Sequence, residues 1–295
     1  MIKKKIGIVG DSSSGFSTTD LTEMKIGFCP LLITFSDNTT IEDTPSTLKD
    51  EQFYNRINYD KQTAKTSQTP IGEIEKIWKE ELTKFEKIIF IPISKGLSGQ
   101  YSTASMLART SLFKDKVFVF DSNGVSIINW LLVKKAYQMS LNEDNDITTI
   151  IKALEIIRDN YLTFILPFDL SYLVRGGRIS KTAAALAKFG KITPILSFDG
   201  TIDKFDKTRT WKKAINHTLK EINKIKKFKN ITLFYIIHAF AQPEMIIEVK
   251  KYVDNCGIKN VKIINLANVI CAHTGIGTFS FICFDLEKDK LPQLT

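Results

Sequence analysis

Short apolar runs alternate with amphipathic segments in the first half of this chain. Residues 6–9, 30–35, 88–91 and 117–120 are apolar runs of the length that suits buried strands. Between the second and third runs, the apolar residues are spaced as on one face of a helix. They are Ile74, Ile77, Trp78, Leu82 and Phe85. Another helix is expected around residues 101–107. Strands that alternate with helices predict a mostly parallel sheet covered by helices on both faces.

The second half of the chain predicts a mixed α/β sheet. Strands are expected at residues 162–166, 194–198, 231–237 and 261–264. The dipeptide Asp199-Gly200 lies between apolar runs, which is a hairpin signal. A polar stretch at residues 142–146 is the best linker candidate, and Asp146 is suited to cap the helix that follows. We therefore expect two α/β domains, at residues 1–158 and 159–295.

Composition narrows the class of protein. A chain of 295 residues that is 43% hydrophobic is long enough to bury a core in each of two domains. Neither a membrane-spanning run nor a secretory signal is recognisable, so a cytoplasmic protein is expected. The net charge of +9 comes largely from lysine-rich stretches such as residues 212–213 and 224–229. No nucleic-acid recognition motif accompanies them, so the basic surface suits an acidic partner or anionic ligand rather than DNA or RNA.

Several catalytic classes find no support in the sequence. The four cysteines lie far apart without a Cys-x-x-Cys pair, which argues against a zinc ribbon or a dithiol redox site. The glycine-rich nucleotide-binding motifs and the Gly-x-Ser-x-Gly elbow are also missing. With only three histidines, a Ser/His hydrolase or a multi-histidine metal centre is poorly supported. We expect neither a metal nor a cofactor.

A turn rich in glycine and hydroxyl groups follows the strand expected at residues 88–91. Its sequence is Ser94-Lys95-Gly96-Leu97-Ser98-Gly99-Gln100, and it opens the next helix. Glycines let the backbone approach a ligand closely, and hydroxyl and amide groups at a helix start donate hydrogen bonds to an anion. Ser98 is therefore a candidate binding residue, although a serine in this place also suits a plain helix cap.

A second hydroxyl cluster, residues 65–70, precedes the helix expected to start near Gly72. It includes Thr66 and Ser67, and its plain interpretation is again a capped helix entry. In open α/β sheets, ligands collect at the carboxyl ends of the strands. If both turns lie at that edge, Thr66 and Ser98 each donate one hydrogen bond to the same carboxylate.

Positive charges and one histidine complete the candidate residues. Arg175 and Arg178 flank paired glycines, which form either a helix C-cap or a concentrated site for phosphate or carboxylate. Arg209 lies just before another expected helix, and its segment suits either an ordinary helix start or an anion-binding site. His273 stands in a glycine-rich segment, which indicates a loop close to a ligand.

Taken together and in order, these turns resemble those of the DegV family over nearly the whole chain. The matching segments are Asp11-Ser12-Ser13, Thr66-Ser67-Gln68, residues 94–101, Asp121-Ser122, residues 173–180, residues 194–196 with Asp199-Gly200, residues 207–210 and residues 273–277. One such tetrapeptide would be weak, but eight matches in the family's order are strong.

The resemblance implies two α/β domains with one long-chain fatty acid between them. It implies an apolar tunnel for an acyl chain of about sixteen to eighteen carbons. The carboxylate would be bound by Thr66, Ser98 and His273, with Ser67, Gly99 and Thr274 beside them in their motifs.

The resemblance also implies a partner, an ATP-dependent fatty acid kinase that phosphorylates the presented carboxylate. Arg178 and Arg209 resemble the family's arginines that engage the kinase or its acyl-phosphate product. On this basis the chain is not itself an enzyme, and transient contact with a membrane surface is compatible with its task.

Some positions depart from the family pattern. Gly10 stands where threonine is usual, Gln100 replaces a small hydroxyl residue, Ile276 replaces proline, and the proline after Thr66-Ser67-Gln68 is displaced to Pro70. These changes put loop geometry in question more than ligand class. Two other functions stay open: a dihydroxyacetone-kinase-like phosphotransferase acting on a small polar substrate, and a lipid-responsive regulator without a kinase partner.

Overall fold

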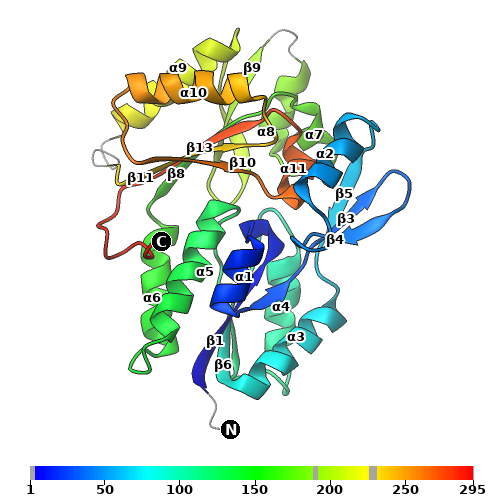
Figure 1. The fold of residues 1–295 in the computed structure, drawn as a ribbon, viewed down its shortest axis with the longest axis vertical. Helices are drawn as coiled ribbons and strands as arrows, with labels where there is room; N and C mark the ends of the chain where they lie inside the picture. Colours follow the sequence, from blue (N-terminus) through cyan, green and yellow to red (C-terminus); the bar gives the residue numbers. More distant parts are fainter. Residues whose placement is uncertain (1–3, 189–191, 226–230, 295) are drawn as a thin grey trace. The chain divides into compact units, whose positions relative to one another are not determined.

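The computed structural model describes residues 4–188, 192–225 and 231–294, which form two compact units (Figure 1). The first unit consists of Met1–Asp159 with Ala267–Val269 and Asp289–Thr295, and the second of Asn160–Leu266 with Ile270–Lys288. Residues 226–229, part of the lysine-rich stretch noted above, lie outside the described ranges. No helix within those ranges combines the length and the apolar character that crossing a membrane requires.

A parallel sheet of four strands forms the centre of the first unit as described, in the order β2-β1-β6-β7. These strands are β1 (Lys4–Asp11), β2 (Gly27–Cys29), β6 (Phe85–Ile91) and β7 (Val117–Val119). All neighbouring pairs run parallel. The predicted strands at residues 6–9, 88–91 and 117–120 are thereby confirmed.

Helices cover both faces of this sheet, as predicted. On one face lie α3 (Ile71–Lys84) and α4 (Gln100–Ala108), where the Trp78 ring packs 5.8 Å from Phe90 and 5.3 Å from Phe113. On the other lies α5 (Ile127–Ser140), where Gly10 faces Val133, and α6 (Ile147–Arg158) packs beside α5. Asp146 caps α6 as predicted, accepting a hydrogen bond of 2.7 Å from the Thr149 backbone.

A small antiparallel sheet in the first unit was not anticipated. Its order is β4-β3-β5, with β3 (Leu32–Phe35), β4 (Thr40–Glu42) and β5 (Ala64–Ser67). The apolar run at residues 30–35 thus ends in a strand, but outside the parallel sheet. Two further helices, α1 (Thr18–Met24) and α2 (Asp50–Asn58), belong to this unit, and Phe53 of α2 packs 6.1 Å from Phe35 of β3.

A mixed sheet forms the second unit, as predicted. Its described strands follow the order β10-β9-β8-β13-β11-β12, and only β11 and β12 pair in parallel. They are β8 (Tyr161–Leu166), β9 (Thr193–Phe198), β10 (Ile202–Thr208), β11 (Leu233–His238), β12 (Val261–Asn265) and β13 (Phe279–Phe284). Asp199-Gly200 joins β9 to β10 in an antiparallel hairpin, which confirms the turn signal.

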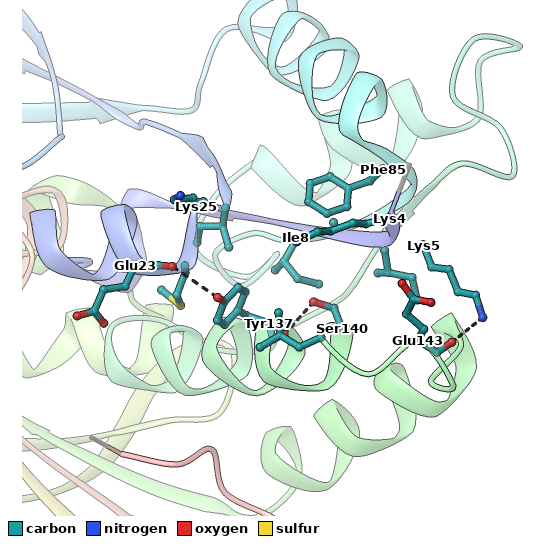
Figure 2. A pocket seen from close by; sticks show the side chains of 14 residues that line it. Lys4, Lys5, Ile8, Glu23, Lys25, Phe85, Tyr137, Ser140 and Glu143 are labelled. Atoms are coloured by element: carbon teal, nitrogen blue, oxygen red, sulfur yellow. Dashed lines mark hydrogen bonds between the residues drawn. The ribbon is translucent and has the colours of Figure 1, made fainter. Parts of the chain in front are cut away.

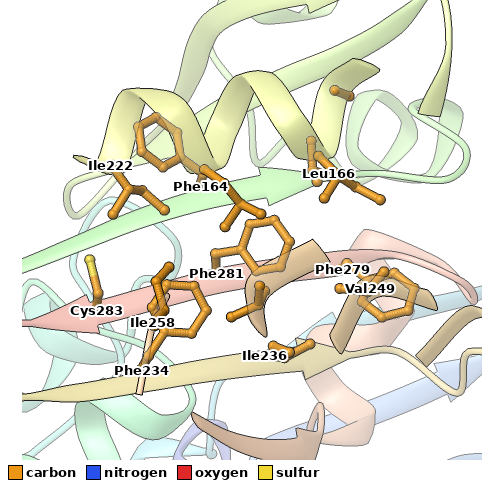
Figure 3. Close-up of a cluster of buried hydrophobic side chains, with 14 of the residues drawn as sticks. Phe164, Leu166, Ile222, Phe234, Ile236, Val249, Ile258, Phe279, Phe281 and Cys283 are labelled. Atoms are coloured by element: carbon orange, nitrogen blue, oxygen red, sulfur yellow. The ribbon is translucent and has the colours of Figure 1, made fainter. Parts of the chain in front are cut away.

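The core of the second unit lies between this sheet and two helices, α9 (Trp211–Lys224) and α10 (Pro243–Asn255). Figure 3 shows Phe164, Phe234 and Phe281 of the sheet in one buried cluster with Ile222 of α9 and Val249 of α10. The shorter helices are α7 (Ser171–Gly176), α8 (Lys181–Ala184) and α11 (Asn268–Thr274). Helix α11 begins in the first unit and continues in the second.

Two expectations need correction. Phe85 does not continue the helical stripe, because the backbone at that residue turns extended and begins β6. His273 does not lie in a loop but in the last turn of α11, and the glycines begin only after that helix ends.

Candidate functional site

The carboxyl edge of the parallel sheet is fixed by the buried Asp11 at the end of β1. Its carboxylate accepts hydrogen bonds from the backbone of Ser13 (3.1 Å), the Ser13 hydroxyl (2.5 Å) and the backbone of Ile93 (2.8 Å). The bond to Ile93 ties the end of β1 to the loop after β6. Burial raises the pKa of Asp11 from 3.8 to about 6, against the opposing effect of these hydrogen bonds. The Asp-Ser-Ser motif therefore holds the loops of this edge in place.

Ser98 lies in the loop between β6 and α4 and is half-buried. Its Oγ accepts a hydrogen bond of 3.2 Å from the Gln100 backbone at the start of α4, although the N-cap residue of that helix is Gly99 and not Ser98. A hydroxyl that accepts one hydrogen bond still has a proton to donate. The contact with the Gln100 backbone is thus compatible with ligand binding at Ser98.

Thr66 and Ser67 lie in β5 and not at a helix entry. Thr66 pairs with the fully buried Ile33, and residues directly opposite each other in an antiparallel pair share one face of the sheet. Successive side chains of a strand point to opposite faces, and Ser67 is exposed while Thr66 is half-buried. Of these two hydroxyls, Thr66 therefore has the more protected position.

The structure brings the two hydroxyl-rich segments of the first unit together. The side chain of Gln100, which is fully buried, accepts 3.0 Å from the Thr69 backbone and donates 3.0 Å to the Thr69 hydroxyl. Gln68 donates 2.9 Å to the Thr103 hydroxyl of α4. A Cβ at Gly99 would lie 2.9 Å from the Gln68 side chain, so the segments approach closely where glycine stands. Gln100 thus departs from the family pattern but locks the loop after Thr66 to the start of α4.

Gly10 has a similar steric explanation. A Cβ at this position would lie 2.9 Å from the Phe16 ring and 3.3 Å from Val133. The ring of Phe16 therefore takes the space that a threonine side chain would need. This turn contributes no hydroxyl from position 10.

In the second unit, His273 packs against α7. A Cβ at Gly176 would collide with Nδ1 of His273, so this glycine gives the imidazole its room. Burial, together with the positive charge of Arg178, lowers the pKa of His273 from 6.5 to about 4. The ring is therefore neutral at physiological pH. Thr274 follows, buried, and its Oγ1 has no hydrogen-bond partner among the described residues.

Arg178 and Arg209 lie near opposite ends of β10. Ile179, next to Arg178, pairs with Ile202 at the start of β10, whereas Arg209 follows Thr208 at its end. A strand rises about 3.3 Å per residue, so β10 separates the two positions by about 20 Å. Arg178 also donates 2.5 Å to the Gly176 carbonyl, and Arg209 is exposed. The two arginines therefore do not form a single cationic cluster.

A pocket of about 330 Å³ lies elsewhere in the first unit, at the amino end of β1 (Figure 2). Lys4, Lys5, Phe85, Tyr137 and Ser140 are among its lining residues. Lys5 donates a hydrogen bond of 2.6 Å to the backbone carbonyl of Glu143, which is drawn as a dashed line in Figure 2. None of the sequence-predicted site residues lines this pocket, and parallel sheets bind ligands at the opposite edge. Across the described ranges, no cluster of three or more His, Cys, Asp or Glu side chains is arranged to hold a metal ion.

Sequence inspection missed two packing partners of the site. The sequence indicates Gln100 only as a departure from the family pattern, and Gly176 only as part of a C-cap or an anion site. Neither role has a local signal, because each depends on a contact with a segment distant in sequence, Thr69 for Gln100 and His273 for Gly176.

A known protein family and one of its members match this chain over nearly its full length. The family model described as "Uncharacterised protein, DegV family" matches residues 5–285. A DegV domain-containing protein of Staphylococcus aureus is 31% identical over 277 residues, covering 93% of this chain and 97% of its own.

Solved structures share the fold. The crystal structure of DegV from Bacillus subtilis, described as a fatty acid binding protein, superposes with a TM-score of 0.81 at 26% identity, covering 96% of this chain and 100% of its own. A stearic acid-binding protein from Eubacterium ventriosum has a TM-score of 0.77 at 21% identity, covering 96% and 98%. With its motifs, its two α/β units and a family match from residue 5 to residue 285, this chain belongs to the DegV family.

Proposed function

We propose that this protein binds one long-chain fatty acid and presents its carboxylate to a partner fatty acid kinase. The observation that supports binding most strongly is the likeness to the fatty-acid-binding DegV of Bacillus subtilis over 96% of this chain. The residues that the resemblance assigns to the carboxylate, Thr66, Ser98 and His273, are all present. Burial of the acyl chain would supply most of the affinity, at about 0.8 kcal/mol per methylene.

Thr66, Ser98 and His273 each bring a donor to the carboxylate in this proposal. The hydroxyl of Ser98 is oriented by the Gln100 backbone, and Thr66 lies on the protected face of β5. Because the pKa of His273 is lowered to about 4, its imidazole acts as a neutral N–H donor and not as a cation. Ser67, Gly99 and Thr274 flank these donors, and the buried Thr274 hydroxyl is suited to a fourth hydrogen bond.

Neutral donors suit a carrier that must hand its ligand on. Three hydrogen bonds from neutral groups would fix the position of the carboxylate, and neutral donors withdraw less charge from its oxygens than a direct ion pair would, so that one oxygen can still attack the γ-phosphate of ATP. The kinase would supply Mg²⁺ and charge neutralisation for phosphoryl transfer. The chain itself would catalyse nothing, would work in the cytoplasm without nucleic acid, and would meet a membrane surface only transiently.

Arg178 and Arg209 would face the kinase or the acyl phosphate. Because about 20 Å of β10 separates them, they would contact different groups. Arg178, whose charge helps to lower the pKa of His273, is the one suited to the head of the ligand. Arg209, exposed beyond the end of β10, is suited to the protein partner.

Two separate assays test this function. Delipidated protein is titrated with palmitate and oleate, and then incubated with a fatty acid kinase, ATP and Mg²⁺ while hydroxylamine traps acyl phosphate. Stoichiometric binding together with acyl hydroxamate formation is the expected result. Binding without acyl phosphate would favour a lipid-responsive regulator, and the absence of binding would overturn the carrier function itself.

A further inference from the structure

Asp43 is a buried carboxylate that the sequence did not single out. It follows β4, is only 6% exposed, and lies beside the first turn of α11. Its carboxylate accepts a hydrogen bond of 3.2 Å from the Val269 backbone, 226 positions further along the chain. The side chains of Ser12 and Asn268 also hydrogen-bond to it. Three segments of the first unit therefore meet at one carboxylate.

Asn268 adds a second tether at the same end of the helix. Its amide donates 3.2 Å to the Leu48 carbonyl, and the residue is 4% exposed. The first turn of α11 is thus held from two sides, by Asp43 and by the Leu48 backbone. No helical hydrogen bond is available for the first amides of any helix, so these contacts decide where the axis of α11 starts.

The other end of α11 carries His273. The helix has seven residues, Asn268–Thr274, so at about 3.6 residues per turn His273 lies little more than one turn from Val269, the residue that Asp43 contacts. A short helix behaves as one rigid piece, and a shift of its first turn moves its last turn. At that far end, Gly176 packs against the buried imidazole of His273, because a Cβ at this position would collide with the ring.

Burial of Asp43 is costly, which argues for a specific role. Desolvation raises the pKa of Asp43 from 3.8 to about 7, and the charge of Asp50 adds to this, while the hydrogen bonds from Val269, Ser12 and Asn268 oppose it. An apolar residue would fill the position without this penalty. A buried carboxyl group that several segments of the chain hydrogen-bond, and whose pKa is nevertheless raised by desolvation, is typical of residues that organise a functional site.

We propose that Asp43 is a positioning residue for His273, which it holds in place through α11. This role rests on the proposed function, in which His273 binds the fatty-acid carboxylate. Asp43 touches no ligand in this scheme. It sets the start of the helix whose last turn presents the imidazole.

Fatty-acid affinity provides the first test. Asp43→Ala should raise the Kd for palmitate about tenfold, whereas Asp43→Asn, which keeps an acceptor oxygen for Val269, should stay within about threefold of the original. In a His273→Ala background, Asp43→Ala should cause no further loss, because both changes act on one interaction. Full additivity of the two losses would overturn the role.

Asp146→Ala is the matched control. Asp146 also caps a helix through its carboxylate, but α6 carries no residue of the site. This variant should lower thermal stability and leave the Kd unchanged. If it weakens binding as much as Asp43→Ala does, the effect of Asp43 is a general loss of stability, and the proposed positioning is wrong.

A second readout needs no ligand and separates this inference from the function on which it rests. The chain has three histidines, so the imidazole signals in nitrogen-labelled protein can be assigned by single substitutions. Asp43→Ala should shift the ring signals of His273 and spare those of His217, and Asp146→Ala should shift neither. Unmoved His273 signals would overturn the inference even if fatty acid binds. If Asp43→Ala fails to fold, Asn268→Ala removes the second tether of α11 and should give the same shift.

Discussion

The contact between Gly176 and His273 predicts that one substitution weakens fatty-acid binding and leaves the stability of the fold almost unchanged. In Gly176→Ala, the new Cβ would collide with Nδ1 of His273 and crowd the ring, with Cε1 at 3.3 Å and Cγ at 3.4 Å. The backbone of Gly176 is helical, so alanine causes no backbone strain there and contributes up to about 1 kcal/mol of helix propensity, which offsets part of the cost of moving the ring. The imidazole must move, and a lost hydrogen bond to a carboxylate is worth about 1.5–3 kcal/mol. We expect the Kd for palmitate to rise roughly 10- to 100-fold, with the melting temperature almost unchanged.

The neighbouring glycine is the matched control. Gly177 has a φ of 66°, and a Cβ added there would meet no atom within 4 Å. Gly177→Ala should therefore lose about 1 kcal/mol of stability through backbone strain and keep its affinity. Isothermal titration and thermal melting of both variants measure the two effects. The reasoning is refuted if Gly176→Ala binds as well as the original protein, or if Gly177→Ala is the weaker binder.

Three further substitutions test other parts of the account. Ser98→Ala should weaken palmitate binding by about 1–3 kcal/mol in titration, with the exposed Ser102→Ala on α4 as the control, and unchanged binding in a folded protein would remove Ser98 from the site. Arg209→Ala should keep fatty-acid binding and lower acyl-phosphate formation with the kinase. Equal loss of both would contradict the assignment of Arg209 to the kinase and not to the fatty acid. Asp43→Asn should change how the free energy of unfolding depends on pH. Between pH 3.8 and about 7, the folded protein holds a proton on Asp43 that the unfolded chain has lost. The original protein therefore loses stability as the pH rises through this window, by at most about 4 kcal/mol. The variant lacks this loss and should gain on the original protein between pH 5 and pH 8 in denaturant titrations, and a gap that is constant with pH would contradict the raised pKa.

The elements that sequence predicts well are those with a local apolar period and a local cap. The stripe through Ile74 and Trp78 marks α3, and Asp146 marks the start of α6, because each signal lies within a few residues of the structure it specifies. Strand β6 is equally clear from its continuous apolar run. These features depend little on the rest of the chain.

Strands defined by their partners are harder to predict. Strand β10 lies at an edge of the described sheet and is mostly charged, with Phe205 between two Asp-Lys pairs, so only the Asp199-Gly200 turn before it gives a signal. Strand β13 carries a plain apolar run, residues 279–284, which the strands predicted for the second half of the chain do not include. It lies between β8 and β11, and its antiparallel pairing with both depends on contacts far apart in sequence.

The candidate site shows the same limit. The motifs identify Ser98, Thr66 and His273 as a group, but not the contacts that seat them. The bond between Gln100 and Thr69, the room at Gly176 and the tether at Asp43 all join distant segments. A glycine-rich flank suggested a loop at His273, yet residues 268–274 form a helix, and the first turn of that helix is tied to Asp43 and Leu48.

The most direct measurement of the central claim is native mass spectrometry of the purified protein, followed by solvent extraction and identification of what it carries. The account predicts one fatty acid of about sixteen to eighteen carbons per chain, lost on delipidation and regained on addition of palmitate or oleate. A protein that arrives empty and takes up neither acid would contradict the account, and a bound small polyol would favour the phosphotransferase instead.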